Sequence, residues 1–169
     1  VDRLLEIYPD YASRFRVVFY GPQPYEVDVR AHKAMRHPHL VSFEPAVDYL
    51  ESLAIMQAAD ALILIDGLFT QADDGIADNP FFPGKLTDYL GARRPIVGIT
   101  MRSGPTAEVL TAARHMVADD RIDRIAFCLK RTIDGKNNPD YEASHPYQCM
   151  VVNAQMESVF RSAIAGAAP

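Results

Sequence analysis

Cysteine is scarce in this chain of 169 residues, which contains only Cys128 and Cys149. The two stand far apart and outside any Cys-x-x-Cys pattern, so they predict neither a disulfide framework nor a zinc site. Scarce cysteine is ordinary in a reducing compartment, and no stretch has the pattern of a signal peptide. We therefore expect a cytoplasmic protein.

Basic residues and long apolar runs are also in short supply. Lysine and arginine total 17 against 22 acidic residues, which gives a net charge of -5. No basic stripe runs along the sequence, so nucleic acid is not an expected partner. The longest apolar runs are too short to cross a bilayer as a helix.

Several functional motifs are missing as well. No G-x-G-x-x-G follows the expected strand at 15–20, which disfavours a dinucleotide-binding domain. The same segment lacks the acidic pair of a receiver-like signalling domain. Ser103 lies in no nucleophile-elbow pattern. His37 and His39 stand close together without a third ligand at metal-binding spacing, so we expect no metal site.

The chain does contain a regular alternation of apolar runs and helical patterns, in a length that suits one domain. Strands are expected at 15–21, 40–44, 61–66, 95–99 and, weakly, 116–118. Helices are expected at 3–8, 26–37 (or an irregular crossover there), 46–59, 85–92, 105–114, 121–132 and 146–166. This order predicts an α/β fold with a doubly wound, Rossmann-like parallel sheet in which 61–65 and 95–99 are central strands.

The last of these helices has a recognisable start in the sequence. Ser144 suits an N-cap, and Pro146 suits the first turn of a helix that continues to residue 166. We therefore divide the chain into a Rossmann-like domain at 1–145 and a C-terminal helical segment at 146–169.

Loops at the carboxyl ends of the strands are the expected ligand site, because open parallel sheets bind ligands there. Four such loops contain "GPQP", "EPAVDY", "DGLFTQADDGIADNPFFPGK" and "TMRSGPT". The third is unusually long for a strand-to-helix connection, and long loops in compact domains are frequently functional. Its Phe81 and Phe82 could stack on a sugar or a base, or could only pin the loop.

Gly84 and Lys85 stand where a helix is expected to begin, just past this long loop. A helix N-terminus presents unpaired N–H groups and a partial positive charge, which suits a phosphate. Gly84 allows close approach of a ligand to the backbone, and Lys85 adds a full positive charge. Asp88, one turn later, could accept hydrogen bonds from a ribose diol. The alternative is an ordinary helix start with a solvated lysine.

The segment "FPGKLTDYLGARRPIVGI" resembles the "P-S-K-L-x-E-Y-L-A-A-G-K-P-V-I-A" segment of retaining glycosyltransferases with the GT-B fold, especially family 4. Upstream, "FRVVFYGP" is similar to the first strand of their donor-binding domain. The stretch "VSFEPAVDYLESLAIMQAADALILIDG" resembles their "V-x-F-x-G-x-V-x-x-x-E-L-x-x-L-x-x-A-D-V-L-L-L-P". Downstream, "SGPTAEVLTAA" resembles "G-E-x-A-x-x-L". These segments occur in the family's order between Phe15 and Ala113.

The resemblance implies the C-terminal, donor-binding half of a two-domain enzyme. Such an enzyme transfers a sugar, here of hexosyltransferase type, from a nucleoside diphosphate to an acceptor hydroxyl with retention, often in polysaccharide biosynthesis. The donor is a substrate, and no tightly bound cofactor or metal is implied. Val1 begins inside an expected helix, so we expect an N-terminal acceptor domain in the full-length protein, with 146–169 packing back toward it. The full-length enzyme could associate peripherally with a membrane, and 1–169 alone should be inactive.

The resemblance also assigns roles to particular residues. Lys85 and the helix N-terminus would stabilise the departing diphosphate. The family has an earlier glutamate that is separated from the ribose-binding one by seven residues, and Asp78 is the acid nearest to that position. Lys85 and Asp78 are therefore the expected catalytic residues. The expected donor contacts are Gly21, Pro45, Val47, Pro83, Gly84, Lys85, Leu86 and Asp88.

This chain departs from the family pattern at several of these positions. The ribose-binding glutamate is replaced by Asp88, which is shorter by one methylene, and the first glutamate position falls on Pro80. Pro45 or Glu44 takes the place of the glycine expected after the second strand, and "GPQPYE" lacks the usual basic residue. These departures imply a divergent subfamily or reduced catalytic competence. Half of a sugar-nucleotide epimerase and a non-catalytic nucleotide-sugar-binding or scaffold domain remain as alternatives.

Overall fold

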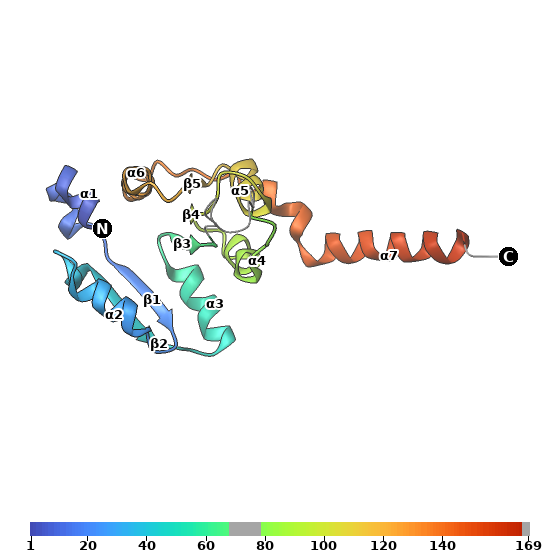
Figure 1. The fold of residues 1–169 in the computed structure, drawn as a ribbon. Helices are drawn as coiled ribbons and strands as arrows, with labels where there is room; N and C mark the ends of the chain where they lie inside the picture. Colours follow the sequence, from blue (N-terminus) through green and yellow to red (C-terminus); the bar gives the residue numbers. More distant parts are fainter. Residues whose placement is uncertain (68–78, 167–169) are drawn as a thin grey trace.

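The computed structural model describes residues 1–67 and 79–166, and it is an α/β protein of parallel strands (Figure 1). The strands are β1 (Val17–Gly21), β2 (Val41–Pro45), β3 (Leu62–Ile65), β4 (Ile96–Ile99) and β5 (Met116–Ala118). The α-helices are α1 (Asp2–Ile7), α2 (Glu26–Lys33), α3 (Tyr49–Ala58), α4 (Gly84–Gly91), α5 (Pro105–Ala112), α6 (Ile122–Ile133) and α7 (Cys149–Gly166). Short 3-10 helices are η1 (Pro9–Ser13), η2 (Pro38–Leu40) and η3 (Tyr141–Tyr147). The alternation of strands and helices expected from the sequence is confirmed.

The described strands form two parallel sheets instead of the one that the sequence predicts. β1 pairs with β2 from Val17 opposite Val41 to Gly21 opposite Pro45, whereas β3, β4 and β5 form a separate sheet in that order. β4 is therefore central in the three-stranded sheet, whereas β3, which was also expected to be central, lies at the edge of that sheet. Apolar runs identify strands, but they do not specify which strands hydrogen-bond to each other.

Helices cover both faces of the three-stranded sheet. On one face, residues of α4 and α5 pack with β3 and β4 in a cluster of Leu62, Leu64, Leu86, Leu90, Ile96, Val109 and Leu110. On the other face, α6 packs through Cys128 against Val97 and Ala118. α5 lies very close to β4, since a Cβ atom at Gly98 would be 2.4 Å from the Leu110 side chain. Coverage of both faces is what a parallel sheet requires.

The β1–β2 pair is less well covered. Phe19 and Phe43 stack on one face with ring centroids 5.6 Å apart, and the His32 ring of α2 meets Phe43 edge-on. Tyr20 nevertheless remains 47% exposed, and α2 buries no residue. In Figure 1 this pair lies on the β3 side of the other sheet, with α3 running between them.

The N-terminal segment ties the two sheets together. Leu4 and Leu5 of α1 are buried where α1 packs along α6, and Arg3 pairs with Asp123 at 2.6 Å. On its other side, Glu6 of α1 forms an ion pair with Arg36, just after α2. α1 therefore bridges α6 and the α2 region.

The 3-10 helix η1 adds a second attachment to α6. The Tyr11 hydroxyl donates to Asp134 at the end of α6 (2.6 Å), and Arg14 reaches the same carboxylate at 3.2 Å. Hydrogen bonds from Lys130 and Tyr11 hold the pKa of Asp134 well below its usual range. The carboxylate therefore stays charged at neutral pH and keeps these contacts.

The C-terminal helix begins later than the sequence predicts. Residues 141–147 form η3, which Asp140 caps by accepting from the Glu142 N–H at 3.1 Å. Ser144 donates to the Tyr141 carbonyl instead of capping a helix, and Pro146 lies inside η3. α7 therefore starts at Cys149, and Figure 1 shows it extending away from the rest of the molecule. Among the described residues, none of the helices combines the length and apolarity needed to span a bilayer.

Candidate functional site

The N-terminus of α4 lies at the carboxyl edge of the three-stranded sheet. α4 follows β3 and leads into β4, which runs parallel to β3, so the helix must run back against the strand direction and start at that edge. Leu86 and Leu90 are buried and fix the helix on the sheet. Gly84 and Lys85 are exposed at its start. The helix start therefore lies at the edge of the sheet where the sequence predicted it.

Pro83 and Leu86, both expected donor contacts, serve the local structure of this helix start. Pro83 is the N-cap residue, and its carbonyl accepts the Leu86 N–H at 2.9 Å. The Leu86 side chain is fully buried in the core. Leu86 thus positions the helix, and its side chain does not line a surface site.

Gly84 and Lys85 offer the open groups of the site. Among the described residues, no acceptor takes the backbone N–H of either, and Lys85 has no ion-pair partner. A Cβ atom at Gly84 would meet no described atom within 4 Å. The first turn is closed internally by Thr87, whose hydroxyl donates to the Gly84 carbonyl at 2.7 Å. This arrangement leaves N–H donors and one cation directed to the same exposed helix end.

Asp88 has a partner that the sequence did not suggest. The Tyr49 hydroxyl, at the start of α3, donates to the Asp88 carboxylate at 3.0 Å. This hydrogen bond raises the pKa of the Tyr49 phenol. Because α3 follows β2, the contact joins the loop after β2 to the helix after β3. Tyr49 stands next to Asp48, the N-cap residue of α3. The sequence nevertheless could not predict its contact with Asp88, because residues 39 positions apart form no local pattern.

The loops after β3 and β4 are also joined. The buried Thr100 hydroxyl donates to the Asp66 carboxylate at 3.2 Å. Asn79, also buried, donates to the Gly67 carbonyl at 3.2 Å and accepts from the Phe81 N–H at 2.9 Å. These contacts hold the segment before α4 against the sheet edge. No local pattern in the sequence points to Asn79 or Thr100.

The remaining expected donor contacts lie on the other sheet. Gly21 and Pro45 are register partners at the carboxyl ends of β1 and β2, and Val47 is half-buried just beyond them. The expected residues therefore form two groups, one on each sheet. The Tyr49–Asp88 hydrogen bond links the start of α3, just after β2, to α4.

Part of the expected site cannot be placed. Asp78, expected as a catalytic residue, lies outside the described residues. Phe82 stacks on Tyr147 of η3 with ring centroids 6.5 Å apart, which fits the loop-pinning interpretation, whereas Phe81 is 63% exposed. Within residues 1–67 and 79–166, no three His, Cys, Asp or Glu residues gather in a way that could hold a metal ion.

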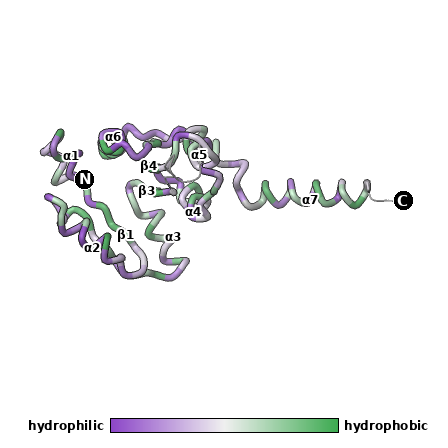
Figure 2. The backbone as a smooth tube through the Cα atoms, viewed as in Figure 1, coloured by the Kyte–Doolittle hydropathy of each residue, from purple (hydrophilic) through white to green (hydrophobic). Residues whose placement is uncertain are grey.

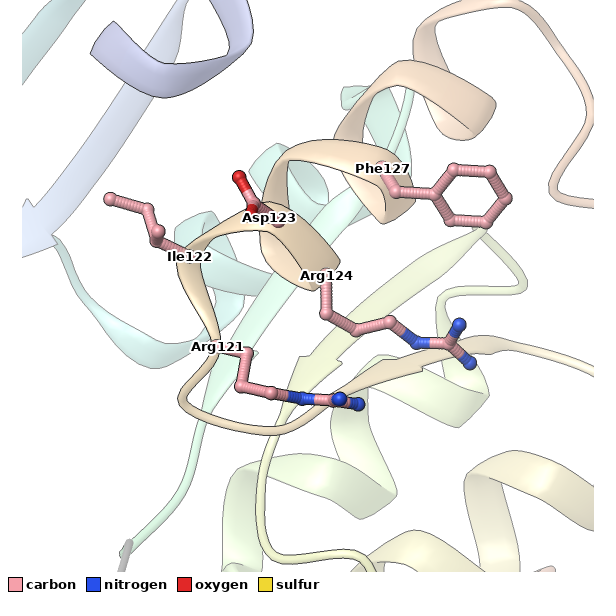
Figure 3. A pocket seen from close by; sticks show the side chains of 5 residues that line it. All are labelled: Arg121, Ile122, Asp123, Arg124 and Phe127. Atoms are coloured by element: carbon pink, nitrogen blue, oxygen red, sulfur yellow. The ribbon is translucent and has the colours of Figure 1, made fainter.

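A hollow lies at the start of α6, on the face of the sheet opposite α4 (Figure 3). It has a volume of ≈ 570 Å³ and is lined by Arg121, Ile122, Asp123, Arg124 and Phe127. In Figure 3 Arg121 and Arg124 extend to the same side as Phe127. Arg121 is already engaged: it and Arg102 bind Asp119, and these hydrogen bonds, the one from Arg121 foremost, hold the pKa of that carboxyl well below its usual range. The hollow is open to solvent, and one of its two arginines, Arg121, already forms an ion pair with Asp119.

Comparisons with known proteins do not identify the chain by similarity. No family model matches it, and no curated protein matches it. The function of the chain is therefore inferred from its residues and their geometry.

Proposed function

We propose that this chain is the donor-binding half of a retaining glycosyltransferase of the GT-B type, of hexosyltransferase kind, and that it binds a nucleoside-diphosphate sugar. The observation that carries the proposal is the open N-terminus of α4, where unpaired backbone N–H groups and the exposed Lys85 coincide at the carboxyl edge of a parallel sheet. Parallel sheets bind nucleotides at this edge, and helix N-termini bind phosphate.

The chemistry expected at this helix end follows from charge. When a sugar leaves a nucleoside diphosphate, negative charge builds up on the diphosphate oxygens. The fixed N–H groups of Gly84 and Lys85 and the Lys85 ammonium group would lie closest to that charge and stabilise the transition state. Asp78 remains the proposed acid near the sugar.

Asp88 is suited to the ribose of the donor. It lies one turn into α4, and its carboxylate can accept from hydroxyl groups of a diol. Tyr49 occupies one carboxylate oxygen with a 3.0 Å hydrogen bond, which fixes the direction of the shorter side chain and leaves the second oxygen for a ligand. This contact fixes the orientation of the carboxylate, but the side chain remains shorter than glutamate by one methylene.

We further propose that the two sheets are halves of one doubly wound sheet in the order β2-β1-β3-β4-β5. Both sheets are parallel, and β1 and β3 each keep one edge without a described strand partner. Tyr20 and Ile65, on these two strands, are 47% and 58% exposed. A strand–helix–strand connection through α3 is compatible with the usual right-handed crossover. Joining β1 to β3 would bring Gly21, Pro45 and Val47 to the same edge as Gly84.

The acceptor and part of the catalytic machinery would come from another domain of the full-length protein. Within the described residues, the site has only one wall, formed by α4 and the adjoining loops. A second domain would close the cleft, exclude water and hold the acceptor hydroxyl against the sugar. The same assignment implies an enzyme of polysaccharide biosynthesis that works in the cytoplasm and can associate peripherally with a membrane.

Calorimetric titration of Lys85→Ala tests the proposal. Loss of this charge-assisted contact should weaken nucleoside-diphosphate binding while binding of the nucleoside stays nearly unchanged. The cost is about 1.5–3 kcal/mol, or roughly 10- to 150-fold, where the contact excludes water, and it is smaller where the contact stays hydrated. Lys33→Ala removes an equally exposed lysine at the end of α2 and serves as the matched control. Equal weakening of both ligands would show that Lys85 does not contact phosphate. Absence of binding by the unmodified chain would favour the scaffold alternative.

A further inference from the structure

α7 carries an apolar stripe that no described part of the chain covers. Successive helical residues are rotated by about 100°, so Val152, Met156, Val159, Phe160, Ala163 and Ile164 fall on one face. Phe160 is 59% and Ile164 75% exposed. Among the described elements, η3 packs most closely against α7, at the N-terminal end of the helix. Figure 2 shows apolar residues recurring along the whole projecting helix.

The stripe is bordered on one side by a single acid and a single base. Glu157 and Arg161 form an ion pair at 2.6 Å across one turn of the helix. Together with Asn153, Met156, Phe160 and Ile164 they line a shallow hollow of ≈ 500 Å³ along the helix. The polar residues Gln155, Ser158 and Ser162 lie on the opposite side. The apolar centre therefore has one negative and one positive group at the same border.

We propose that this face binds the α7 of a second copy of the chain, with the two helices antiparallel, in place of the N-terminal domain that the family resemblance implies as the neighbour of 146–169. A two-fold axis at the level of Val159 relates positions two residues before and two residues after it. Glu157 of one copy then lies opposite Arg161 of the other, and the reverse pair forms as well. In antiparallel pairs, the same borders of both helices meet, as this arrangement requires. A two-fold interface must be self-complementary, and this one is.

Other arrangements and partners fit less well. In a parallel pair the opposite borders of the two helices meet, so Glu157 and Arg161 would face the partner's uncharged border and the charge complementarity would be lost. An anionic membrane surface requires a basic border, and α7 contains a single basic residue, Arg161. Although the whole chain has a net charge of -5, the α7 segment contains one acid and one base and is neutral. Electrostatic repulsion therefore does not oppose pairing at this helix.

Sedimentation velocity of the 169-residue chain over a concentration series provides the first test. The unmodified chain should shift from the mass of one copy toward that of two copies as its concentration rises. Phe160→Glu places a charge in the stripe and should keep the chain monomeric. Ser158→Glu adds the same charge on the opposite face and should leave dimerisation unchanged. A chain that stays monomeric up to its solubility limit, or a Phe160→Glu variant that dimerises like the unmodified chain, overturns the proposal.

A charge-exchange experiment tests the antiparallel geometry. Glu157→Arg alone places four cations at the interface and should abolish the dimer at concentrations where the unmodified chain is mostly dimeric. Combining Glu157→Arg with Arg161→Glu restores opposite charges across the interface and should recover the dimer. Circular dichroism of each variant checks that α7 remains helical. A single variant that dimerises normally, or a double variant that stays monomeric while helical, contradicts the proposed geometry. Neither result would bear on nucleotide binding at α4.

Discussion

At the scale of single residues, side chains extend the hydrogen-bonding ladder of β4 beyond its neighbouring strand. The N–H of Ile96 donates to Nδ1 of His115 at 3.2 Å, and the Ile96 carbonyl accepts from the Asn137 amide at 3.1 Å. β5 pairs with β4 only from Val97 onward. These two side chains therefore form the hydrogen bonds with Ile96 that a neighbouring strand would otherwise form. His115 is 7% exposed, and this burial lowers its pKa to about 4.

His115 should make stability depend on pH. Its pKa in the folded state is about 4, below the ordinary value of 6.5, so the unfolded chain binds more protons between these values. Stability should be full above pH 6.5 and fall as the pH decreases toward 4, by up to about 3 kcal/mol from this group. Urea unfolding at a series of pH values measures the change.

The matched variant is His115→Gln, whose amide oxygen can accept the Ile96 N–H but does not titrate. It should show a smaller loss of stability between pH 6.5 and 4 than the unmodified chain. If both proteins lose the same stability over this range, other groups cause the pH dependence.

Gly104 is a position where only glycine fits. Its φ is +107°, and an added Cβ atom would lie 2.4 Å from the backbone carbonyl oxygen of Asn79. Because both a strained backbone conformation and a contact with rigid backbone are involved, Gly104→Ala should destabilise the fold by about 2–3 kcal/mol. The measurement is the midpoint of urea unfolding.

Gly135→Ala is the control for this change. Gly135 also has a positive φ, +67°, but a Cβ atom there would meet no described atom within 4 Å. Its substitution should cost only the conformational strain, about 1–2 kcal/mol. Equal costs at both positions would show that the contact with Asn79 contributes nothing.

The sequence indicated some residues of the candidate site better than others, for a physical reason. Gly84, Lys85 and Asp88 could be proposed because a helix start is a local pattern of neighbouring residues. Tyr49 and Asn79 were not found, because their roles depend on contacts between segments that are distant in the chain. Leu86 was assigned to the ligand through the family resemblance, although its spacing with Leu90 is also that of a core position.

At the scale of elements, the positions of helices and strands could be predicted to within a few residues. Apolar periodicity gave α4, α5 and α6 because each has one buried face. The predicted start of α7 was wrong, because a 3-10 helix and an α-helix can begin with the same capping residues and prolines. The pairing of β1 was also not predictable, because a strand's apolar pattern fits several neighbours equally well.

Hydrogen exchange tests the proposed joining of β1 to β3. The Leu62 and Asp66 N–H groups donate to β4, so by alternation the N–H groups of Ile63 and Ile65 point to the free edge of β3. If β1 joins this edge, one or both of these two amides become hydrogen-bonded. We expect protection at Ile63 or Ile65 to approach that of Leu62, which is bonded to β4 in either case. Amide-resolved exchange measured by NMR provides the comparison.

Fast exchange at both Ile63 and Ile65, with Leu62 protected, would show that the β3 edge is open in solution. The two sheets would then be separate units held by α1 and its contacts with α6 and Arg36. The proposed continuous sheet would be wrong, while the helix start at Gly84 would be unaffected.

At the scale of the whole molecule, the described chain has a covered parallel sheet and an open helix start, which the proposed nucleotide-binding half requires, but only one side of the proposed cleft. The three-stranded sheet is covered on both faces, so it has a core of its own. The exposed groups at the start of α4 face solvent among the described residues. A protein with this arrangement should fold without a partner domain but should hold its ligand loosely.

We therefore predict that the 169-residue chain binds a nucleoside diphosphate weakly and transfers no sugar. Binding is weak because the ligand stays in contact with water, where charge–charge contacts contribute little. Transfer is absent because the acceptor must be held against the donor carbon, and such positioning can supply ~7–11 kcal/mol of barrier reduction. Calorimetry with UDP, GDP and ADP measures the first expectation, and a sugar-nucleotide turnover assay on the same sample measures the second. Multiple turnovers by this chain alone would contradict the two-domain interpretation, because they would show that one wall of the cleft is sufficient for the reaction.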